Sequence, residues 1–409
     1  RTIYCRIMGM GELMSSPIME AVLFAKKQSV LLLDSRKFII TTGEQGEGDP
    51  DYGATSEALA PYRDGEEKAQ ARILLFPGFI CSWIGGTGCA PLPGLLGRNG
   101  SDFSAAIIGS SLDSKKVEFW TDVDGIYTAD PRIVKDALIV EDMSYEEAME
   151  LSFFGSKVLH PKTLAPLASK NIEAWSLNSL NPSARGTRIG RGPFENSVLN
   201  SGVSLQDDSE LSASTSNVSG GNSYGSVKSA VRGISCLKNT AMISVSGTGM
   251  KGKTGMAGRV FAAVSRVNVS VLLITQSSSE YTISFCVPGT KADVASDSLS
   301  KEFELEIQDG IVDPIEVHKG CAIVSVVGDG MIKKRGTAGK FFDALATYGI
   351  NILAIAQGSS ERCISTVVRG ESGDKAVRAA HVFFFHSAQS IDLFLFGCGG
   401  IGSALLNQI

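Results

Sequence analysis

The sequence has no pair of cysteines spaced like a metal-binding or redox motif. Its eight cysteines are scattered between positions 5 and 398 without a Cys-x-x-Cys spacing, which predicts neither a zinc site nor a disulfide framework. Basic residues are not in excess either, because 38 Lys and Arg stand against 43 Asp and Glu, for a net charge of −5. We therefore expect no nucleic-acid partner, and any phosphate ligand must be held by local groups.

Long apolar runs are a second feature that we do not find in the sequence pattern. We expect no membrane partner, because no apolar stretch approaches the roughly 20 residues that span a bilayer. The chain starts at Arg1 without a methionine and stops at Ile409 inside an apparent helix. We therefore expect a fragment at both ends, so the absence of a signal or transit peptide decides nothing. A length of 409 residues is typical of two or three domains.

The first half of the chain alternates predicted strands and helices. This order indicates an α/β fold with a mostly parallel sheet covered by helices on both faces. The strands are expected at 30–33, 37–42, 72–76, 117–121 and 172–177, and the helices at 17–28, 101–112, 144–153 and 161–170. The helix at 144–153 opens with the capping box Ser144-Tyr-Glu-Glu147. Residues 43–70 are expected to form a long surface excursion. Residues 191–230 are rich in Ser, Asn, Gly and Asp, which is typical of a linker.

Two segments carry the pattern of a polyphosphate site. In the first, Gly97 and Gly100 allow a tight turn, and Ser101-Asp102 opens a helix whose N-terminus favours an anion. Arg98 can add a two-pronged grip on a carboxylate or phosphate. In the second, the strand 117–121 breaks into an acidic loop that ends at Arg132. Ligands of α/β sheets bind at such strand ends.

The second segment also carries a family resemblance. FWTDVDGIYTADPR at 119–132, followed by GSKVLHPKT at 155–163, closely resembles the aspartate kinases of the amino acid kinase family. The resemblance implies phosphoryl transfer from ATP, with Mg²⁺, to the β-carboxylate of L-aspartate, without a protein metal ligand that we can identify. It implies substrate or catalytic roles for Glu12, Arg98, Ser101 and Asp102, and ATP binding by Thr121, Asp122, Tyr127, Arg132 and Lys157.

Some positions have a simpler interpretation or depart from the family. Glu12 could be a helix-capping carboxylate, and for His160 we favour a packing or capping role over a chemical one. Residues 77–96 differ from the family, and Asn99 replaces its usual glycine, although asparagine tolerates a left-handed backbone. Residues 1–8 contain nothing like the family's K-F-G-G-[ST] loop, whose lysine stabilises the transferring group. We therefore expect this chain to be weakly active or inactive.

The second half of the chain is a duplication. A shift of 81 residues superimposes Gly247-Thr-Gly-Met250 on Gly328-Asp-Gly-Met331 and Gln276 on Gln357 without a gap. Each unit has the order β-α-β-β-α, which resembles the paired ACT domains of aspartate kinases. We refer to residues 231–315 as unit 1 and to residues 316–388 as unit 2. The resemblance implies L-threonine as inhibitor, bound by Gln276 and Gln357, and a homo-oligomer formed through the units, although a purely structural duplication is an alternative.

The last residues, 389–409, form a predicted strand, a G-x-G-x-x-G turn at Gly397, Gly399 and Gly402, and the start of a helix. This pattern is typical of an NAD(P)-binding domain. The order of segments resembles the bifunctional aspartate kinase/homoserine dehydrogenases of bacterial cytoplasm or plant plastids. NAD(P) would serve only the complete protein. The alternative function is an amino-acid sensor whose kinase-like domain (1–190) is silent. Other amino acid kinases are disfavoured because they lack these motifs together with paired units.

Overall fold

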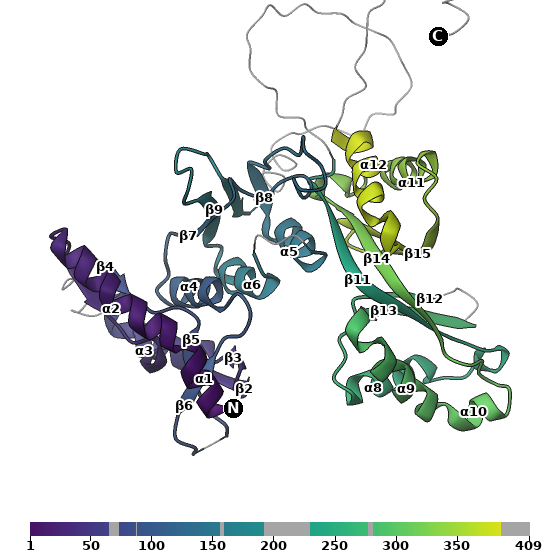
Figure 1. Cartoon of the computed structure of the whole chain (residues 1–409), viewed down its shortest axis with the longest axis horizontal. Coiled ribbons are helices and arrows are strands. Elements are labelled where there is room, and N and C mark those ends of the chain that lie inside the picture. The colour runs from purple at the N-terminus through teal and green to yellow at the C-terminus, as the bar shows by residue number, and fades with distance from the viewer. Residues whose placement is uncertain (65–72, 87, 156–158, 192–229, 277–280, 386–409) are drawn as a thin grey trace, which may run out of the picture.

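The computed structural model describes residues 1–64, 73–86, 88–155, 159–191, 230–276 and 281–385 (Figure 1). The predicted roles of Lys157, of the linker at 192–229 and of Gly397, Gly399 and Gly402 lie outside the described residues.

The N-terminal residues form two consecutive helices, α1 (Thr2–Met8) and α2 (Met10–Ala25). Together Thr2–Ala25 form one apolar helical segment of 24 residues that is only 11% buried, long and apolar enough to cross a membrane by length and composition alone. The expectation that no apolar segment has this length was therefore wrong. The sequence pattern suggested a helix only from Pro17, whereas Gly9 keeps a right-handed helical backbone and joins the two helices.

Two small sheets follow these helices. Strands β1 (Val30–Leu32) and β4 (Ile73–Leu75) pair in parallel, and a second sheet has the order β3-β2-β5-β6. Its strands are β2 (Ile40–Glu44), β3 (Glu47–Pro50), β5 (Ile80–Trp83) and β6 (Leu92–Leu95). The predicted surface excursion at 43–70 was wrong, because β3 completes a hairpin with β2 and α3 (Tyr52–Asp64) follows it.

The sheet that positions the site has the order β7-β9-β10-β8, with parallel pairs β7–β9 and β10–β8 around one antiparallel pair. Its strands are β7 (Lys116–Thr121), β8 (Asp142–Ser144), β9 (Glu173–Asn178) and β10 (Thr187–Gly190). The helices α4 (Gly100–Ser111), α5 (Tyr145–Phe153) and α6 (Pro161–Lys170) pack with it. Strands 117–121 and 172–177 and these helices were predicted to within two residues.

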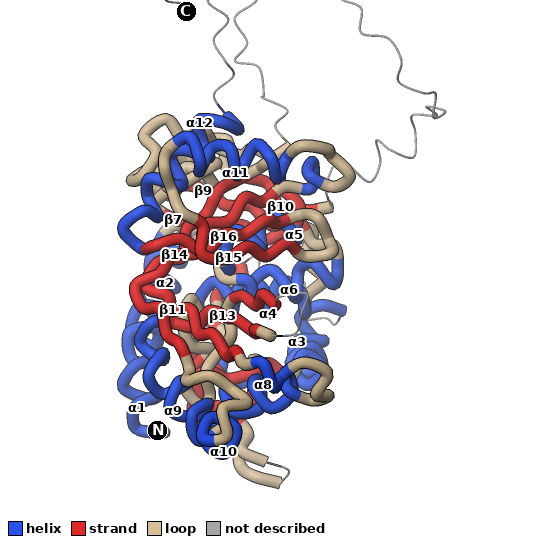
Figure 2. Tube along the Cα trace, turned by 90° about the vertical axis from the view of Figure 1, so that its right-hand side faces the viewer, coloured by secondary structure: helices blue, strands red, loops and turns tan. Residues whose placement is uncertain are grey.

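Both repeat units contribute to one six-stranded sheet of order β12-β13-β11-β14-β16-β15. Its strands are β11 (Gly233–Ser246), β12 (Leu273–Gln276), β13 (Thr282–Pro288), β14 (Glu316–Val327), β15 (Ile352–Gln357) and β16 (Cys363–Arg369). The helices are α8 (Met256–Arg266), α9 (Ala292–Glu302), α10 (Glu304–Gln308), α11 (Thr337–Thr347) and α12 (Gly373–Phe385). Figure 2 shows the unit 1 helices at one end of this sheet and α11 and α12 at the other.

The duplication extends to register and side chains. Ala241 pairs with Val287 in unit 1, and Ala322 pairs with Val368 in unit 2. The cross-strand hydroxyl bond between Ser244 and Ser284, 2.9 Å, recurs between Ser325 and Ser365 at 2.7 Å. Strand β11 is longer than predicted, and its first residues, 233–237, pair with 323–327 of unit 2. The two units therefore form one continuous sheet, in which β11 of unit 1 pairs with β14 of unit 2.

One hydrophobic core joins the kinase-like half to the repeat units. It includes Tyr145, Leu151 and Leu164 from the first half and Ile323 and Val367 from unit 2, all at most 4% exposed. Helix α5 contacts β11 and β14 directly. Figure 1 places it beside the half of the six-stranded sheet that carries α11 and α12. Unit 2 is therefore part of the wall around the candidate site.

Candidate functional site

The glycine turn before α4 adopts the predicted geometry. Gly97 has φ +77° and Asn99, the N-cap of α4, has φ +57°. Asparagine thus takes the left-handed conformation for which the family uses glycine. A Cβ on Gly100 would lie 2.6 Å from a ring carbon of Phe79, so only glycine fits there. The turn leaves Arg98 exposed at the helix N-terminus, as the sequence predicted.

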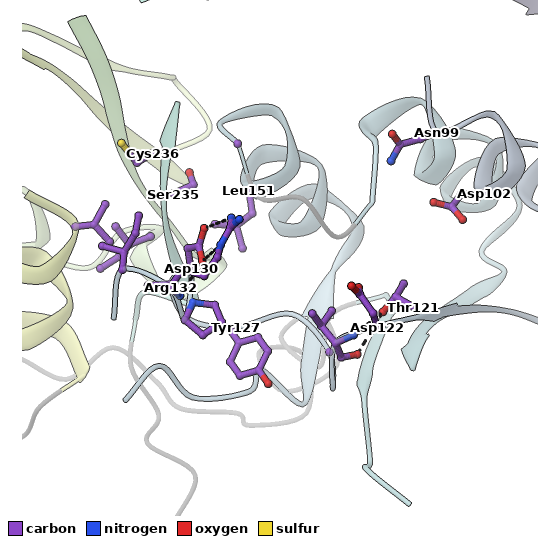
Figure 3. Close-up of a pocket in the computed structure, with 18 residues that line it drawn as sticks. Asn99, Asp102, Thr121, Asp122, Tyr127, Asp130, Arg132, Leu151, Ser235 and Cys236 are labelled. Carbon is purple, nitrogen blue, oxygen red and sulfur yellow. Dashed lines mark hydrogen bonds and ion pairs between the residues drawn. The ribbon is translucent and has the colours of Figure 1, made fainter. Parts of the chain in front are cut away.

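A pocket of about 470 Å³ lies between this turn, the end of β7, the start of β11 in unit 1 and α12 in unit 2. Figure 3 shows Asn99 and Asp102 on one side of it and Ser235 and Cys236 on the opposite side. The predicted residues Asp102, Thr121, Asp122, Tyr127 and Arg132 all line it. The strand-end segment and the helix N-terminus therefore meet, as expected for an α/β sheet.

Charged groups in this pocket are paired or partly desolvated. Arg132 forms an ion pair of 2.5 Å with Asp130 and donates through Nε to the same carboxylate at 2.9 Å. Burial raises the pKa of the Asp102 carboxyl. Burial, with a smaller contribution from the negative charge of Asp124, also raises the pKa of Tyr127. An incoming phosphate would compete with Asp130 for the Arg132 guanidinium.

A second pocket of about 890 Å³ adjoins the first and shares Asn99, Asp130 and Arg132 with it. Arg98 and His160 also line it. The His160 ring accepts a hydrogen bond of 3.2 Å from the Lys162 amide, which caps α6, so the predicted capping role is confirmed. Burial, followed by the charges of Lys162 and Arg98, lowers the pKa of His160.

Two predicted substrate residues do not line either pocket. Glu12 lies on α2, where its carbonyl accepts the Ser16 hydroxyl at 2.7 Å, and Ser101 is exposed in the first turn of α4. One carboxylate of β3 does lie beside the turn, because a Cβ on Gly97 would lie 2.8 Å from Cγ of Glu47. Asp49, also of β3, forms an ion pair of 3.8 Å with Lys162 of α6. The sequence analysis missed both acids because it predicted a surface excursion there.

Carboxylates suited to magnesium line the first pocket. Asp102, Asp122 and Asp130 are among its lining residues, and Mg²⁺ prefers oxygen ligands supplied by one or two carboxylates plus substrate phosphates. Within the described residues, no group of three or more His, Cys, Asp or Glu forms a metal cage. The residues present therefore fit a metal that arrives with the nucleotide rather than one that the protein binds by itself.

The two predicted effector glutamines occupy equivalent positions. Gln276 ends β12 and Gln357 ends β15, and both residues are exposed. Both lie at the two outer strands of the six-stranded sheet. Their side chains are available to a ligand.

Comparison with known proteins identifies the class. Residues 6–178 match the amino acid kinase family, and residues 243–303 and 324–384 each match an ACT domain. The chain therefore joins an amino acid kinase domain to a pair of ACT domains.

Several known proteins are similar to the chain over most of its length. The chain is 42% identical, over its whole length, to a bifunctional aspartokinase/homoserine dehydrogenase of Haemophilus influenzae, and covers 45% of that protein. It is 35% identical over 98% of its length to a chloroplastic protein of the same name from Arabidopsis thaliana, of which it covers 40%. Escherichia coli aspartokinase III in complex with aspartate and ADP superimposes with a TM-score of 0.73 at 26% identity, over 94% of this chain and 76% of that one. The chain is thus similar to aspartokinases over most of its length, and it spans about half the length of the bifunctional relatives that it matches.

Proposed function

We propose that the protein is an aspartate kinase that transfers the γ-phosphoryl group of ATP to the β-carboxylate of L-aspartate. The observation that carries this proposal is the meeting of the 121–132 segment and the turn before α4 in one pocket. The E. coli relative that superimposes on this chain holds aspartate and ADP, which supports two adjacent subsites. We place the kinase domain at 1–190 and the ACT units at 231–315 and 316–388.

The first pocket fits the nucleotide. Thr121 is the last residue of β7 and Asp122 follows it. The Thr121 hydroxyl lies 3.3 Å from the carbonyls of both Val123 and Leu177, and sharing its proton between them ties the loop to β9. Tyr127 lines the pocket, and Arg132 supplies positive charge for phosphate oxygens. We include Lys157 as a nucleotide-binding residue from the family motif alone. Magnesium, when bound with ATP, would neutralise phosphate charge, and Asp102, Asp122 and Asp130 would be its protein-side oxygens.

The second pocket fits aspartate. Arg98 would hold a carboxylate of the substrate in its planar fork. Because a carboxylate nucleophile is already ionised at neutral pH, no general base is needed, and catalysis depends on positioning and charge stabilisation. Glu12 remains a proposed ligand of the substrate ammonium group. Glu47 of β3 is a further candidate because it lies beside the turn that presents Arg98.

The ACT units would make the kinase sensitive to an amino acid. We propose L-threonine as the inhibitor, bound at Gln276 and Gln357, and pairing of ACT units between chains into a homo-oligomer. Regulation of useful strength requires a coupling free energy of about 1–3 kcal/mol between the sites. In the complete protein we propose a fused NAD(P)-dependent homoserine dehydrogenase, because the relatives with that name are about twice as long. These relatives are bacterial or chloroplastic, and we infer a bacterial cytoplasm or a plastid stroma.

ATP-dependent formation of aspartyl hydroxamate tests the kinase proposal. We expect only weak turnover, because residues 1–8 lack the family's lysine loop. That turnover should require L-aspartate, ATP and Mg²⁺ together and should fall at least about 100-fold in Arg98→Ala, because a charge-assisted carboxylate contact is lost. Calorimetry with MgADP gives a second readout. Nucleotide binding without any hydroxamate would instead favour the alternative function, a sensor with a silent kinase domain. Absence of both would contradict the assignment of the first pocket.

A further inference from the structure

The first loop of each ACT unit has the same shape but a different neighbour. Gly247 and Gly328 are both extended, at φ 161° and 171°, and each leads into a short 3₁₀ turn, η3 (Thr248–Met250) or η5 (Asp329–Met331). Thr248 and Asp329 are therefore equivalent positions. The duplication provides an internal comparison of what each loop contacts.

The unit 1 loop packs within its own unit. The Gly249 amide donates to the carbonyl of Ile311 at 3.1 Å. The unit 2 loop instead meets the kinase domain. The amide of Asp329 donates to Oε1 of Glu147 at 2.7 Å, across 182 residues of sequence. A carboxylate of the kinase domain thus accepts a hydrogen bond from a loop amide of unit 2.

Glu147 is held from both domains. Its side chain is 2% exposed, and its other oxygen, Oε2, accepts from the Ser144 amide at 2.9 Å in the capping box of α5. Arg232 approaches Oε1 to 3.8 Å. Burial raises the pKa of this carboxyl, and the hydrogen bonds from the Asp329 and Ser144 amides act in the opposite direction. Each oxygen of the carboxylate therefore has a backbone donor.

Helix α5 connects this contact to the nucleotide pocket. The capping box fixes Glu147 in its first turn, and Leu151 and Gly155, at its other end, line the first pocket. Leu151 also packs against Gly233 of β11, where an added Cβ would lie 2.8 Å from the leucine side chain. A shift of α5 relative to unit 2 would thus move a wall of the pocket.

We propose that Glu147 is a positioning residue that occupies the unit 2 loop as a built-in carboxylate ligand and docks helix α5 on that loop. A free amino acid whose carboxylate took the Asp329 amide would have to displace Glu147 and release α5. The unit 1 loop, which has no such contact from Glu147, would be open to a free amino acid. The predicted displacement of Glu147 by a free amino acid rests on the proposed effector function. The docking of α5 on the unit 2 loop does not depend on that function.

Proline at the loop position gives a specific test. Asp329→Pro removes the amide hydrogen that bonds to Glu147, and the proline Cδ in its place displaces the carboxylate oxygen that lies 2.7 Å from the nitrogen. The backbone accepts proline because Gly328 is extended, with ψ 134°, and Asp329 opens a helical turn. Asp329→Ala keeps the amide and removes only the side chain, which pairs with Arg362 at 2.7 Å. Thr248→Pro makes the same change in unit 1, as the matched control.

Hydrogen–deuterium exchange of the whole chain without nucleotide measures the docking. We expect amides of 145–155 to exchange at least about tenfold faster in Asp329→Pro, because a buried charge-assisted hydrogen bond is lost. Asp329→Ala and Thr248→Pro should leave them protected. MgADP affinity, measured by calorimetry, should fall about tenfold in the same variant only.

The outcomes separate this inference from the proposed function. Equal exchange of 145–155 in Asp329→Pro and Asp329→Ala would overturn the docking role, whether or not the wild type binds nucleotide. If Asp329→Pro does not fold, Glu147→Gln replaces it, because glutamine keeps the size but can accept only one of the two amides. Unchanged exchange in a folded Glu147→Gln variant would equally contradict the proposal. Failure of wild-type nucleotide binding would affect the kinase assignment alone.

Discussion

Replacing Thr128 with valine tests how firmly unit 2 holds the 121–132 segment. Thr128 is 5% exposed and lies between Tyr127 and Asp130 of the first pocket. Its hydroxyl is 2.9 Å from Nε2 of His381 on α12, and it accepts from the Leu138 amide at 3.0 Å. Its carbonyl accepts from the Ile234 amide of β11 at 2.7 Å. Valine keeps the shape of the side chain and removes only the hydroxyl.

The expected loss of stability depends on which partner of the Thr128 hydroxyl can bond to water after the substitution. His381 is 1% exposed, so its Nε2 cannot replace the lost partner with solvent, at a cost of about 1–3 kcal/mol. Leu138 is 49% exposed, so water can satisfy its amide and the loss there is below about 1 kcal/mol. We expect Thr128→Val to lower the free energy of unfolding by about 2–3 kcal/mol. For domains of this size that corresponds to a fall in melting temperature of roughly 5–10 °C.

Thermal unfolding followed by calorimetry measures this change. Thr128→Ser is the matched control, because it keeps the hydroxyl and loses only a methyl group. The double variant Thr128→Val with His381→Phe should be less destabilised than the sum of the two single variants, because the pair is removed together. If Thr128→Val melts within about 1 °C of the wild type, the hydroxyl contributes nothing and the reasoning is refuted. MgADP affinity measured on the same samples shows whether the segment also shifts.

Further predictions concern each proposed ligand site and one ion-pair cluster. Arg98→Lys should weaken aspartate binding about ten- to 100-fold in calorimetry, because lysine lacks the two-pronged fork, and leave MgADP binding unchanged. Gln276→Ala and Gln357→Ala should each weaken threonine binding in calorimetry, because each removes an amide group that can bond the ligand. Arg259, which donates to Glu302 at 2.9 Å, lowers the pKa of that carboxyl. The stabilisation is therefore present above the ordinary Glu pKa of about 4.3 and lost as pH falls through the lower folded value. Arg259→Ala should flatten the acid limb of the melting profile in this range. An unchanged acid limb, full threonine affinity in either glutamine variant, or full aspartate affinity in Arg98→Lys would contradict the respective prediction.

Local chemistry was readable from the sequence. The left-handed Asn99 and the capping box at Ser144 depend on a few neighbouring residues, and the structure has both where the sequence predicted them. The shift of 81 residues predicted equivalent strands, and the Ser244–Ser284 bond recurs at the equivalent pair. The strand-end rule correctly brought Thr121 and Arg132 into one pocket with the α4 turn. These features follow from short-range geometry and strand alternation.

Other features depend on contacts that no local pattern contains. Residues 43–70 lack a clear period, and pairing with β2 is what makes β3 a strand and brings Glu47 to the turn. The apolar periodicity before Pro17 was weak, so the helical span Thr2–Ala25 was underestimated. Glu12, assigned by resemblance, lies on this span and lines neither pocket.

Glu147 shows the division between sequence and tertiary structure in a single side chain. Its role in the capping box was predictable, because Ser144 stands three residues before it and the two groups bond within one helical turn. That bond uses only one carboxylate oxygen. The partner of the other oxygen is an amide 182 residues away, and the contact exists only because the hydrophobic core brings α5 and unit 2 together. The sequence determined which groups can bond, and the tertiary structure decided which distant ones do.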